Sequence, residues 1–225
     1  MGRIKVYGGS QSGAVINALV ADVETPYDLR VYHEACNTSR DGLNWHTMKS
    51  RETQTRKTAA MNIQMPMYFS DFSAARQYQQ RHGAEIWSRK FNTEAGQGIT
   101  KALVPSANYW VEFVPSVSEW RVNVGKFPSG VYEVLGGGKK ILRQDGERLD
   151  WRLSCMGRIP AEVQRVARIT GLAIGYDFSG VDVLMTDEGE AVVIEANKSP
   201  DIRGAETSAW YVDFFKAWAQ VGYRA

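Results

Sequence analysis

Two carboxylates and one amide lie close together near the C-terminus, in a segment whose pattern predicts a β-hairpin. Residues 180–200 read GVDVLMTDEGEAVVIEANKSP, in which DEGE is a turn signal between two β-rich runs. A turn centred on Glu188 and Gly189 places Asp182 directly opposite Glu195. Directly opposed residues have Cβ atoms about 4.5–5.5 Å apart, so like charges there repel unless a positive group lies between them.

The two faces of this hairpin differ in character. Strand alternation puts apolar residues on one face, namely Val181, Val183, Met185, Val192, Ile194 and Ala196. Asp182, Glu195 and Asn197 lie on the other face at one end, and such an oxygen-only ligand set suits Mg²⁺. The alternative is a solvated acidic surface, although Leu184 and Val193 continue that face in apolar form. The residues alone leave both interpretations open.

Earlier segments carry polar groups suited to a nucleotide. Glu119, Arg121 and Asn123 share one face of a predicted strand, which suits contacts to a ribose and phosphates, or equally a solvated edge strand. Gly96 and Gly98 would let backbone amides approach phosphate oxygens closely. Such a pair of glycines alone usually marks only a turn, so its meaning depends on its neighbours.

Taken in chain order, these segments resemble the ATP-grasp enzymes. The hairpin resembles their metal-binding signature, GVD followed by E-A-N-x-x-P, and VEFV at 111–114 resembles the hinge that contacts adenine. EWRV at 119–122 resembles the strand after the hinge, and WSRK at 87–90 with AGQGI at 95–99 resembles the basic strand and phosphate loop. The likeness is to the carboxylate–amine ligase branch, of the ribosomal-protein glutamate ligase type and the ligase-like proteins of bacteriophages. It covers roughly residues 45–215.

The resemblance implies an α+β (α/β) chain with the ATP-grasp fold, in which two α+β subdomains sandwich the nucleotide. We expect a short N-terminal strand-helix-strand subdomain at 1–47, a central subdomain at 48–116 and a C-terminal subdomain with the metal site at 117–225. The stretch GGGKK at 136–140 is expected to be a lid over the phosphates or a flexible hairpin tip. Pro160 is expected to open a helix that Gly171 closes.

The resemblance also assigns roles to individual residues. Asp182, Glu195 and Asn197 would be the metal ligands, and Arg121 and Arg89 would act on the transferred phosphate. The cofactor-binding residues that it implies are Arg89, Lys90, Gly96, Gln97, Gly98, Glu112, Phe113, Val114 and Glu119. In the hinge, the backbone of Glu112 and Val114 would meet the edge of adenine.

Two of the basic contacts stay open. Arg89 and Lys90 both stand at the end of the basic strand, and alternation lets only one of them point inward. We favour Arg89, since the ligase-like phage proteins tolerate arginine at this position. Lys49, Arg51 and Lys57 compete for a second phosphate contact, and the sequence does not decide between them.

The function that follows from the resemblance is an ATP- and Mg²⁺-dependent ligase that joins a carboxylate to an amine through an acylphosphate. The amine acceptor or the acid could belong to a peptide or protein, because the N-terminal subdomain is short. One alternative is a nucleotide-binding module that has lost turnover and acts as a structural partner. It is favoured by Asp201, which replaces the glycine of the family's N-x-x-P-G. A second alternative is a small-molecule kinase.

Composition narrows the class of protein. The 225 residues carry a net charge of +2 with 44% hydrophobic and 23% charged residues, which does not favour nucleic acid or membrane as a partner. No apolar run approaches the ~20 residues needed to span a bilayer, and the first residues lack the apolar core of a signal peptide. Two cysteines without CxxC spacing argue against a zinc site or a disulfide framework. We expect a cytoplasmic protein, in the host cytoplasm if phage-encoded, and leave a homo-oligomer open.

Overall fold

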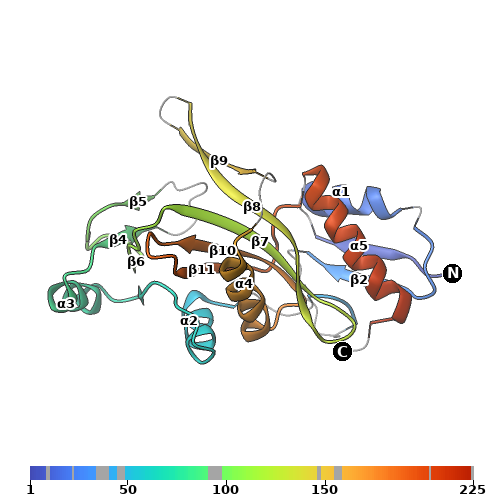
Figure 1. The fold of residues 1–225 in the computed structure, drawn as a ribbon, viewed down its shortest axis with the longest axis horizontal. Helices are drawn as coiled ribbons and strands as arrows, with labels where there is room; N and C mark the ends of the chain where they lie inside the picture. The colour runs from blue at the N-terminus through green and yellow to red at the C-terminus, as the bar shows by residue number, and fades with distance from the viewer. Residues whose placement is uncertain are drawn as a thin grey trace.

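The computed structural model describes residues 1–8, 11–21, 23–33, 41–44, 49–90, 98–145, 148–154, 159–202 and 204–223. The described chain forms three β-sheets with helices packed on them (Figure 1). The largest sheet lies in the middle, the N-terminal sheet lies at one end and a four-stranded sheet lies at the other. The chain is therefore mixed α+β, as the sequence predicts.

The N-terminal unit is a strand-helix-strand arrangement. Strands β1 (Ile4–Tyr7) and β2 (Leu29–Tyr32) pair in parallel, with α1 (Gln11–Val20) as the connection that parallel strands require. The last helix, α5 (Ala205–Val221), returns from the far end of the chain and packs against α1, β1 and β2. The shared core contains Ile4, Val6, Ile16, Leu29, Val31, Phe178, Tyr211, Phe214 and Phe215. Each large apolar side chain buried here contributes about 1.5–3 kcal/mol.

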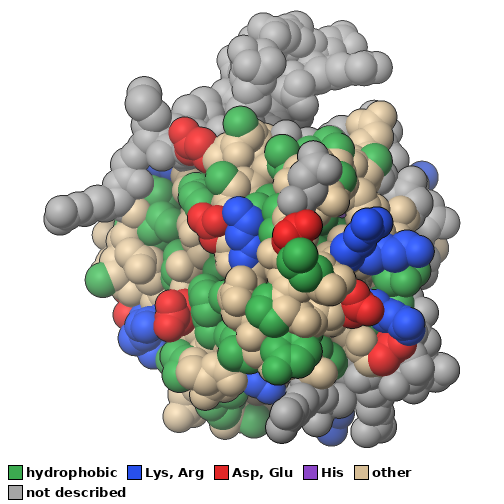
Figure 2. Space-filling view, turned by 90° about the vertical axis from the view of Figure 1, so that its right-hand side faces the viewer, with side chains coloured by type: hydrophobic (Ala, Val, Ile, Leu, Met, Phe, Trp, Pro, Cys, Tyr) green, Lys and Arg blue, Asp and Glu red, His purple; other side chains and the backbone are tan. Residues whose placement is uncertain are grey.

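The end of the molecule formed by this unit shows no concentration of one charge among its described side chains. Figure 2 shows Lys and Arg side chains interspersed with Asp and Glu and with hydrophobic groups on this face. No helix within the described ranges is both long enough and apolar enough to cross a membrane.

The four-stranded sheet follows helix α2 (Arg51–Ala59), which Ser50 caps. Its strands are β3 (Tyr68–Phe69), β4 (Ile86–Arg89), β5 (Ile99–Thr100) and β6 (Tyr109–Glu112), in the order β3-β6-β4-β5. Helix α3 (Phe72–His82) covers one face through a core of Ala75, Ile86 and Trp110. Asp71 caps α3 by accepting from the Ala74 amide at 2.8 Å, and Gly83 ends it at a φ of 65°.

The five-stranded sheet carries the C-terminal half of the chain. It is antiparallel in the order β11-β10-β7-β8-β9, and its strands are β7 (Ser118–Lys126), β8 (Tyr132–Asp145), β9 (Arg148–Ser154), β10 (Phe178–Met185) and β11 (Ala191–Asn197). Helix α4 (Ala161–Ile174) covers one face over a core of valines. Pro160 caps α4, but Gly171 lies inside the helix, which ends at Gly175. Glycine is needed at 171 for packing, because a Cβ there would meet Tyr132 at 2.9 Å.

The expectation that the glycine run 136–138 forms a lid or a hairpin tip is wrong. It lies within β8, paired with Asn123, Val122 and Arg121 of β7. A Cβ at Gly136 would lie 2.3 Å from the Trp210 ring, and one at Gly137 would lie 2.4 Å from the Arg121 carbonyl oxygen. The glycines therefore let α5 and β7 approach the backbone of β8 closely.

The predicted pairing of Asp182 with Glu195 is confirmed, but the strand register that leads to it differs from the prediction. The strands pair Met185 with Ala191, one residue off the expected turn, and a β-bulge at Ile194 restores the register. Because of the bulge, Val193 lies on the α4 side with Val183 and is fully buried there. The expectation that Val192 and Ile194 share the face of Val183 is therefore wrong.

Candidate nucleotide and metal site

A cleft lies between the four-stranded sheet on one side and α2 with β11 on the other. It is lined by Arg51, Pro66, Tyr68, Arg89, Tyr109, Val111 and Ile194. The aromatic and aliphatic groups suit a planar base, whereas the two guanidinium groups suit phosphate oxygens. Ile194 reaches the cleft only because the bulge turns it away from the α4 core.

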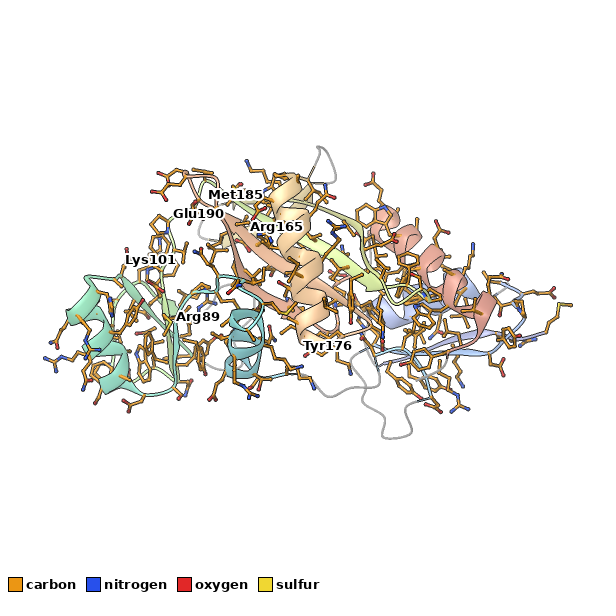
Figure 3. All side chains as sticks on the ribbon, turned by 60° about the horizontal axis from the view of Figure 1, so that its bottom comes forward. Arg89, Lys101, Arg165, Tyr176, Met185 and Glu190 are labelled. Atoms are coloured by element: carbon orange, nitrogen blue, oxygen red, sulfur yellow. The ribbon has the colours of Figure 1, made fainter. Side chains whose placement is uncertain are left out.

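Arg89 is the member of the basic pair that faces this cleft. Figure 3 shows it beside α2, at the boundary between the four-stranded sheet and the central part of the molecule. Its Nε atom is buried and has no hydrogen-bond partner among the described residues. Lys90 is exposed, and its amide donates to the Gly98 carbonyl at 3.1 Å. A buried donor that lacks a partner costs about 1–3 kcal/mol, so Arg89 is placed to gain from an anionic ligand.

The hinge is held from both faces of its sheet. The Glu112 carboxylate points toward α3, where it accepts from the Tyr78 hydroxyl at 3.2 Å and from the Met67 amide at 3.1 Å. The Phe113 ring stacks on Trp87 at 4.4 Å, and its amide donates to the Glu85 carbonyl. Backbone groups alternate along a strand, so the Glu112 carbonyl and the Val114 amide point to the opposite edge.

Asp182 lies at the centre of a compact ion-pair network. It is 3% exposed and accepts from Arg121 through Nε at 2.6 Å and Nη2 at 2.5 Å. Lys140 of β8 donates to Asp182 at 3.0 Å and also to Glu119. Burial would raise the pKa of Asp182, but Arg121 and Lys140 lower it below its ordinary value. Burial raises the pKa of Glu119, with Lys140 opposing that rise.

Glu195 forms a separate ion pair, with Arg51. Arg51 donates to its carboxylate and to the Ile194 carbonyl, and the Asn197 side-chain amide donates to Glu195 at 2.8 Å. The two opposed carboxylates of the hairpin are thus each paired with a guanidinium group. The described residues contain no group of three Asp, Glu, His or Cys side chains arranged for a metal. Two carboxylates and one amide nevertheless supply the hard oxygen donors that suit Mg²⁺ beside phosphates.

The three competing basic residues have different surroundings. Arg51 lines the cleft. The Lys57 ammonium group lies 3.3 and 3.4 Å from the Ala173 and Ile174 carbonyls, where it stabilises the C-terminal end of α4. The Lys49 amide donates to the Tyr176 hydroxyl at 2.5 Å. Arg51 is therefore the one of the three that the structure places next to the site.

Some site residues were missed or lie outside the described chain. Gly96 and Gln97 lie outside it, whereas Gly98 is described with a φ of 72°. Lys140 and Ile194 have no motif that marks them, because their places depend on strand pairing across 21 residues and on the bulge. The cleft aromatics, Tyr68 and Tyr109, could have been found from their alternation with residues that face α3.

Comparisons with known proteins show the fold. No protein-family model matches the chain, and no curated protein matches its sequence. Among solved structures, it is similar to the ATP-grasp ligase PsnB with a minimal precursor, Mg and ADP, with TM-score 0.58 and 17% identity over 74% of this chain and 57% of that one. It is similar to the VanG D-Ala:D-Ser ligase from Enterococcus faecalis, with TM-score 0.59 and 18% identity over 82% and 64%.

A third similar structure is the ADP complex of PurK, an N5-carboxyaminoimidazole ribonucleotide synthetase. Its TM-score is 0.60, with 13% identity over 95% of this chain and 70% of that one. The chain thus spans less than two thirds of the length of PsnB and of VanG. Three sheets, the cleft between two of them and these likenesses agree: the chain has the ATP-grasp fold.

Proposed function

We propose that the chain is an ATP- and Mg²⁺-dependent ligase that joins a carboxylate to an amine through an acylphosphate. One observation carries this proposal. Arg89, whose buried Nε has no hydrogen-bond partner among the described residues, lines the same cleft as Arg51, and Arg51 donates to Glu195 of the hairpin. Arg51 therefore links an aromatic and aliphatic cleft that contains a second guanidinium group to one of the two opposed carboxylates.

The base would lie between the two sheets. Tyr68, Tyr109 and Val111 supply one wall of the slot and Ile194 supplies the other. The Glu112 carbonyl would accept from the exocyclic amine of adenine, and the Val114 amide would donate to the ring. Stacking of Phe113 on Trp87 holds this hinge in place before a nucleotide arrives. Gly96, Gln97 and Gly98 would cover the phosphates with backbone amides.

Asp182, Glu195 and Asn197 would hold Mg²⁺, which supplies charge neutralisation to the phosphates when it is bound. Arg51 touches both Glu195 and the cleft, so its guanidinium group can exchange the carboxylate for a phosphate without a large movement. Glu119 would face the nucleotide, and it accepts a hydrogen bond from Lys140, which also donates to Asp182.

Arg89 and Arg121 would stabilise the charge of the transferred phosphoryl group, with Lys140 next to them. A carboxylate oxygen attacks the γ-phosphorus and ADP leaves, which gives an acylphosphate. The amine nitrogen then attacks the acyl carbon, inorganic phosphate leaves and the nitrogen loses a proton. Positioning and electrostatics suffice for both steps, so the site needs no nucleophilic side chain.

We further propose that one of the two substrates is a peptide or protein. PsnB, a structural neighbour, was solved with a precursor peptide.

Trapping of the acylphosphate tests the proposal. The chain is incubated with ATP, Mg²⁺, hydroxylamine and a set of peptides that contain Asp and Glu, and we expect hydroxamate and ADP to form together. Glu195→Gln should abolish both products, whereas Glu190→Gln, at the exposed hairpin tip, should not. A phosphorylated product without hydroxamate would instead indicate a kinase. Nucleotide binding without any product would indicate the degenerate module.

A further inference from the structure

Asn44 is a fully buried residue that precedes the central part of the chain and lies far in sequence from the hairpin. It is 0% exposed and has a φ of 56°, a left-handed backbone that asparagine adopts more readily than most residues. Such a conformation is kept only when the surroundings determine it, which directs attention to its partners.

The partners of Asn44 lie at the start of β10, directly before it and directly after β11, at one end of the metal hairpin. Its amide donates to Asp177 at 2.6 Å, and its side-chain Nδ2 donates to the carbonyls of Phe178 at 2.8 Å and Lys198 at 3.0 Å. Its Oδ1 accepts from the Phe178 amide at 3.2 Å. The β10–β11 pairing ends at Gly180 and Asn197, so Asn44 bridges the backbone of the two strands just beyond their last pair.

A second buried residue, His33, contacts the far end of segment 198–200, which follows β11. His33, 1% exposed at the end of β2, lies with Nε2 2.9 Å from the Pro200 carbonyl. Pro200 in turn packs on β10, where a Cβ at Gly180 would lie 2.9 Å from it. The backbone of 198–200, which begins directly after Asn197, is therefore fixed at both ends by residues of the N-terminal unit.

We propose that Asn44, assisted by His33, is a positioning residue for the metal site: it sets the place of Asn197 and thereby the affinity for Mg²⁺ with nucleotide. This inference rests on the proposed function. Groups that orient metal ligands without touching the metal typically change its affinity about 10- to 100-fold when they are removed. Asn44 makes three hydrogen bonds from its side chain to backbone that leads into the ligand, so it falls in this class.

The test compares two asparagines with the same backbone conformation. Asn44→Gly keeps the left-handed φ, which glycine adopts freely, and removes only the side-chain bridge. Asn62→Gly is the matched control, because Asn62 has a φ of 55° and is exposed at the end of α2. Binding of a non-hydrolysable ATP analogue is measured by calorimetry on the full chain, with and without Mg²⁺.

We expect Mg²⁺ to strengthen analogue binding in the wild type, and this gain to fall by about 10-fold or more in Asn44→Gly. Binding without Mg²⁺ should change less than about 2-fold, and Asn62→Gly should match the wild type in both states. An Asn44→Gly protein that keeps the full Mg²⁺-dependent gain overturns the inference. A loss equal with and without Mg²⁺ also overturns it, since that result indicates only a general structural role.

His33→Phe provides the second variant if Asn44→Gly does not fold. It removes the contact with Pro200 while leaving a ring of similar size, and a loss confined to the Mg²⁺-dependent gain, of about 10-fold at most, is expected. An unchanged gain in a folded His33→Phe protein counts against the inference in the same way. A wild type that binds the analogue without any Mg²⁺ effect refutes the proposed function instead, and this inference with it.

Discussion

The two sheets beside the cleft, each called a wall, differ in how their charges are balanced. In the five-stranded sheet, Asp182 lies behind the residues that line the cleft and is neutralised by Arg121 and Lys140, so this wall contains an internally balanced network. On the four-stranded sheet, Arg89 lies among aromatic side chains with a buried Nε that no described residue satisfies. The balanced wall should therefore support the fold as well as the ligand, whereas Arg89 should serve the ligand alone.

The largest expected effect is a loss of stability when the ion-pair network of the balanced wall is broken. Asp182→Asn leaves Arg121 and Lys140 with a neutral partner in a buried place, and loss of one partner of a buried pair costs about 3–5 kcal/mol. Urea unfolding should show a fall of about 3 kcal/mol in the free energy of unfolding. Asp187→Asn, at the exposed turn of the same hairpin, should change it by less than about 0.5 kcal/mol. Equal effects of the two variants would show that the network does not stabilise the fold.

The second prediction concerns the opposite wall. Arg89→Met should weaken binding of an ATP analogue by about 1.5–3 kcal/mol, the usual value for a hydrogen-bonded charge, as measured by calorimetry. Its free energy of unfolding should stay level or rise, because the variant removes a buried donor that has no partner among the described residues. Lys90→Met is the control and should affect neither quantity strongly, since Lys90 is exposed. A destabilised Arg89→Met protein with normal affinity would reverse the contrast between the walls.

The bulge provides a sharper comparison within one strand. Val193→Ala should lower the free energy of unfolding by about 2 kcal/mol, because it removes two methyl groups from the α4 core, and should leave analogue affinity unchanged. Ile194→Ala should do the reverse, with about 1 kcal/mol lost from binding and little from stability. Both quantities are read from calorimetry and urea unfolding. If the two variants exchange these effects, the regular register predicted from the turn is correct and the bulge is wrong.

The smallest expected effect is a pH dependence of the balanced wall. The pKa of Asp182 is lowered from its ordinary value of 3.8 in the folded chain, so the unfolded chain binds the proton more readily. Its stabilisation is thus complete above that ordinary value and is lost as the pH falls through the lower folded pKa. The difference in unfolding free energy between wild type and Asp182→Asn should be constant from about pH 5 to 7 and should narrow below about pH 4. If this difference in unfolding free energy widens as the pH falls, the pKa of Asp182 is raised in the folded chain and not lowered.

Local signals were enough to predict much of the fold. The turn signal and strand alternation predicted the hairpin and the pairing of Asp182 with Glu195. The division of the chain at 47/48 and 116/117 stays a prediction. The choice of Arg89 over Lys90 as the residue that binds phosphate also stays a prediction, although the structure places Arg89 in the cleft.

Features that depend on contacts between distant residues could not be predicted. The bulge at Ile194 has no turn residue to mark it, and Lys140 meets Glu119 only because β8 pairs with β7. The glycines at 136–138 resemble a flexible tip, yet Gly136 is required by the approach of the Trp210 ring from the last helix and Gly137 by the approach of the β7 backbone. The same holds for Asn44, whose partners lie more than 130 residues away.

The central claim is that the cleft binds ATP together with Mg²⁺. The most direct test is the thermal stability of the wild type with an ATP analogue and Mg²⁺, separately and together, beside Glu195→Gln and the control Glu190→Gln. A ligand bound only by the folded state at a hundredfold excess over its Kd adds about 2.7 kcal/mol. We predict a shift of this size that requires both ligands, persists in Glu190→Gln and disappears in Glu195→Gln. No shift in the wild type at millimolar nucleotide would contradict the claim.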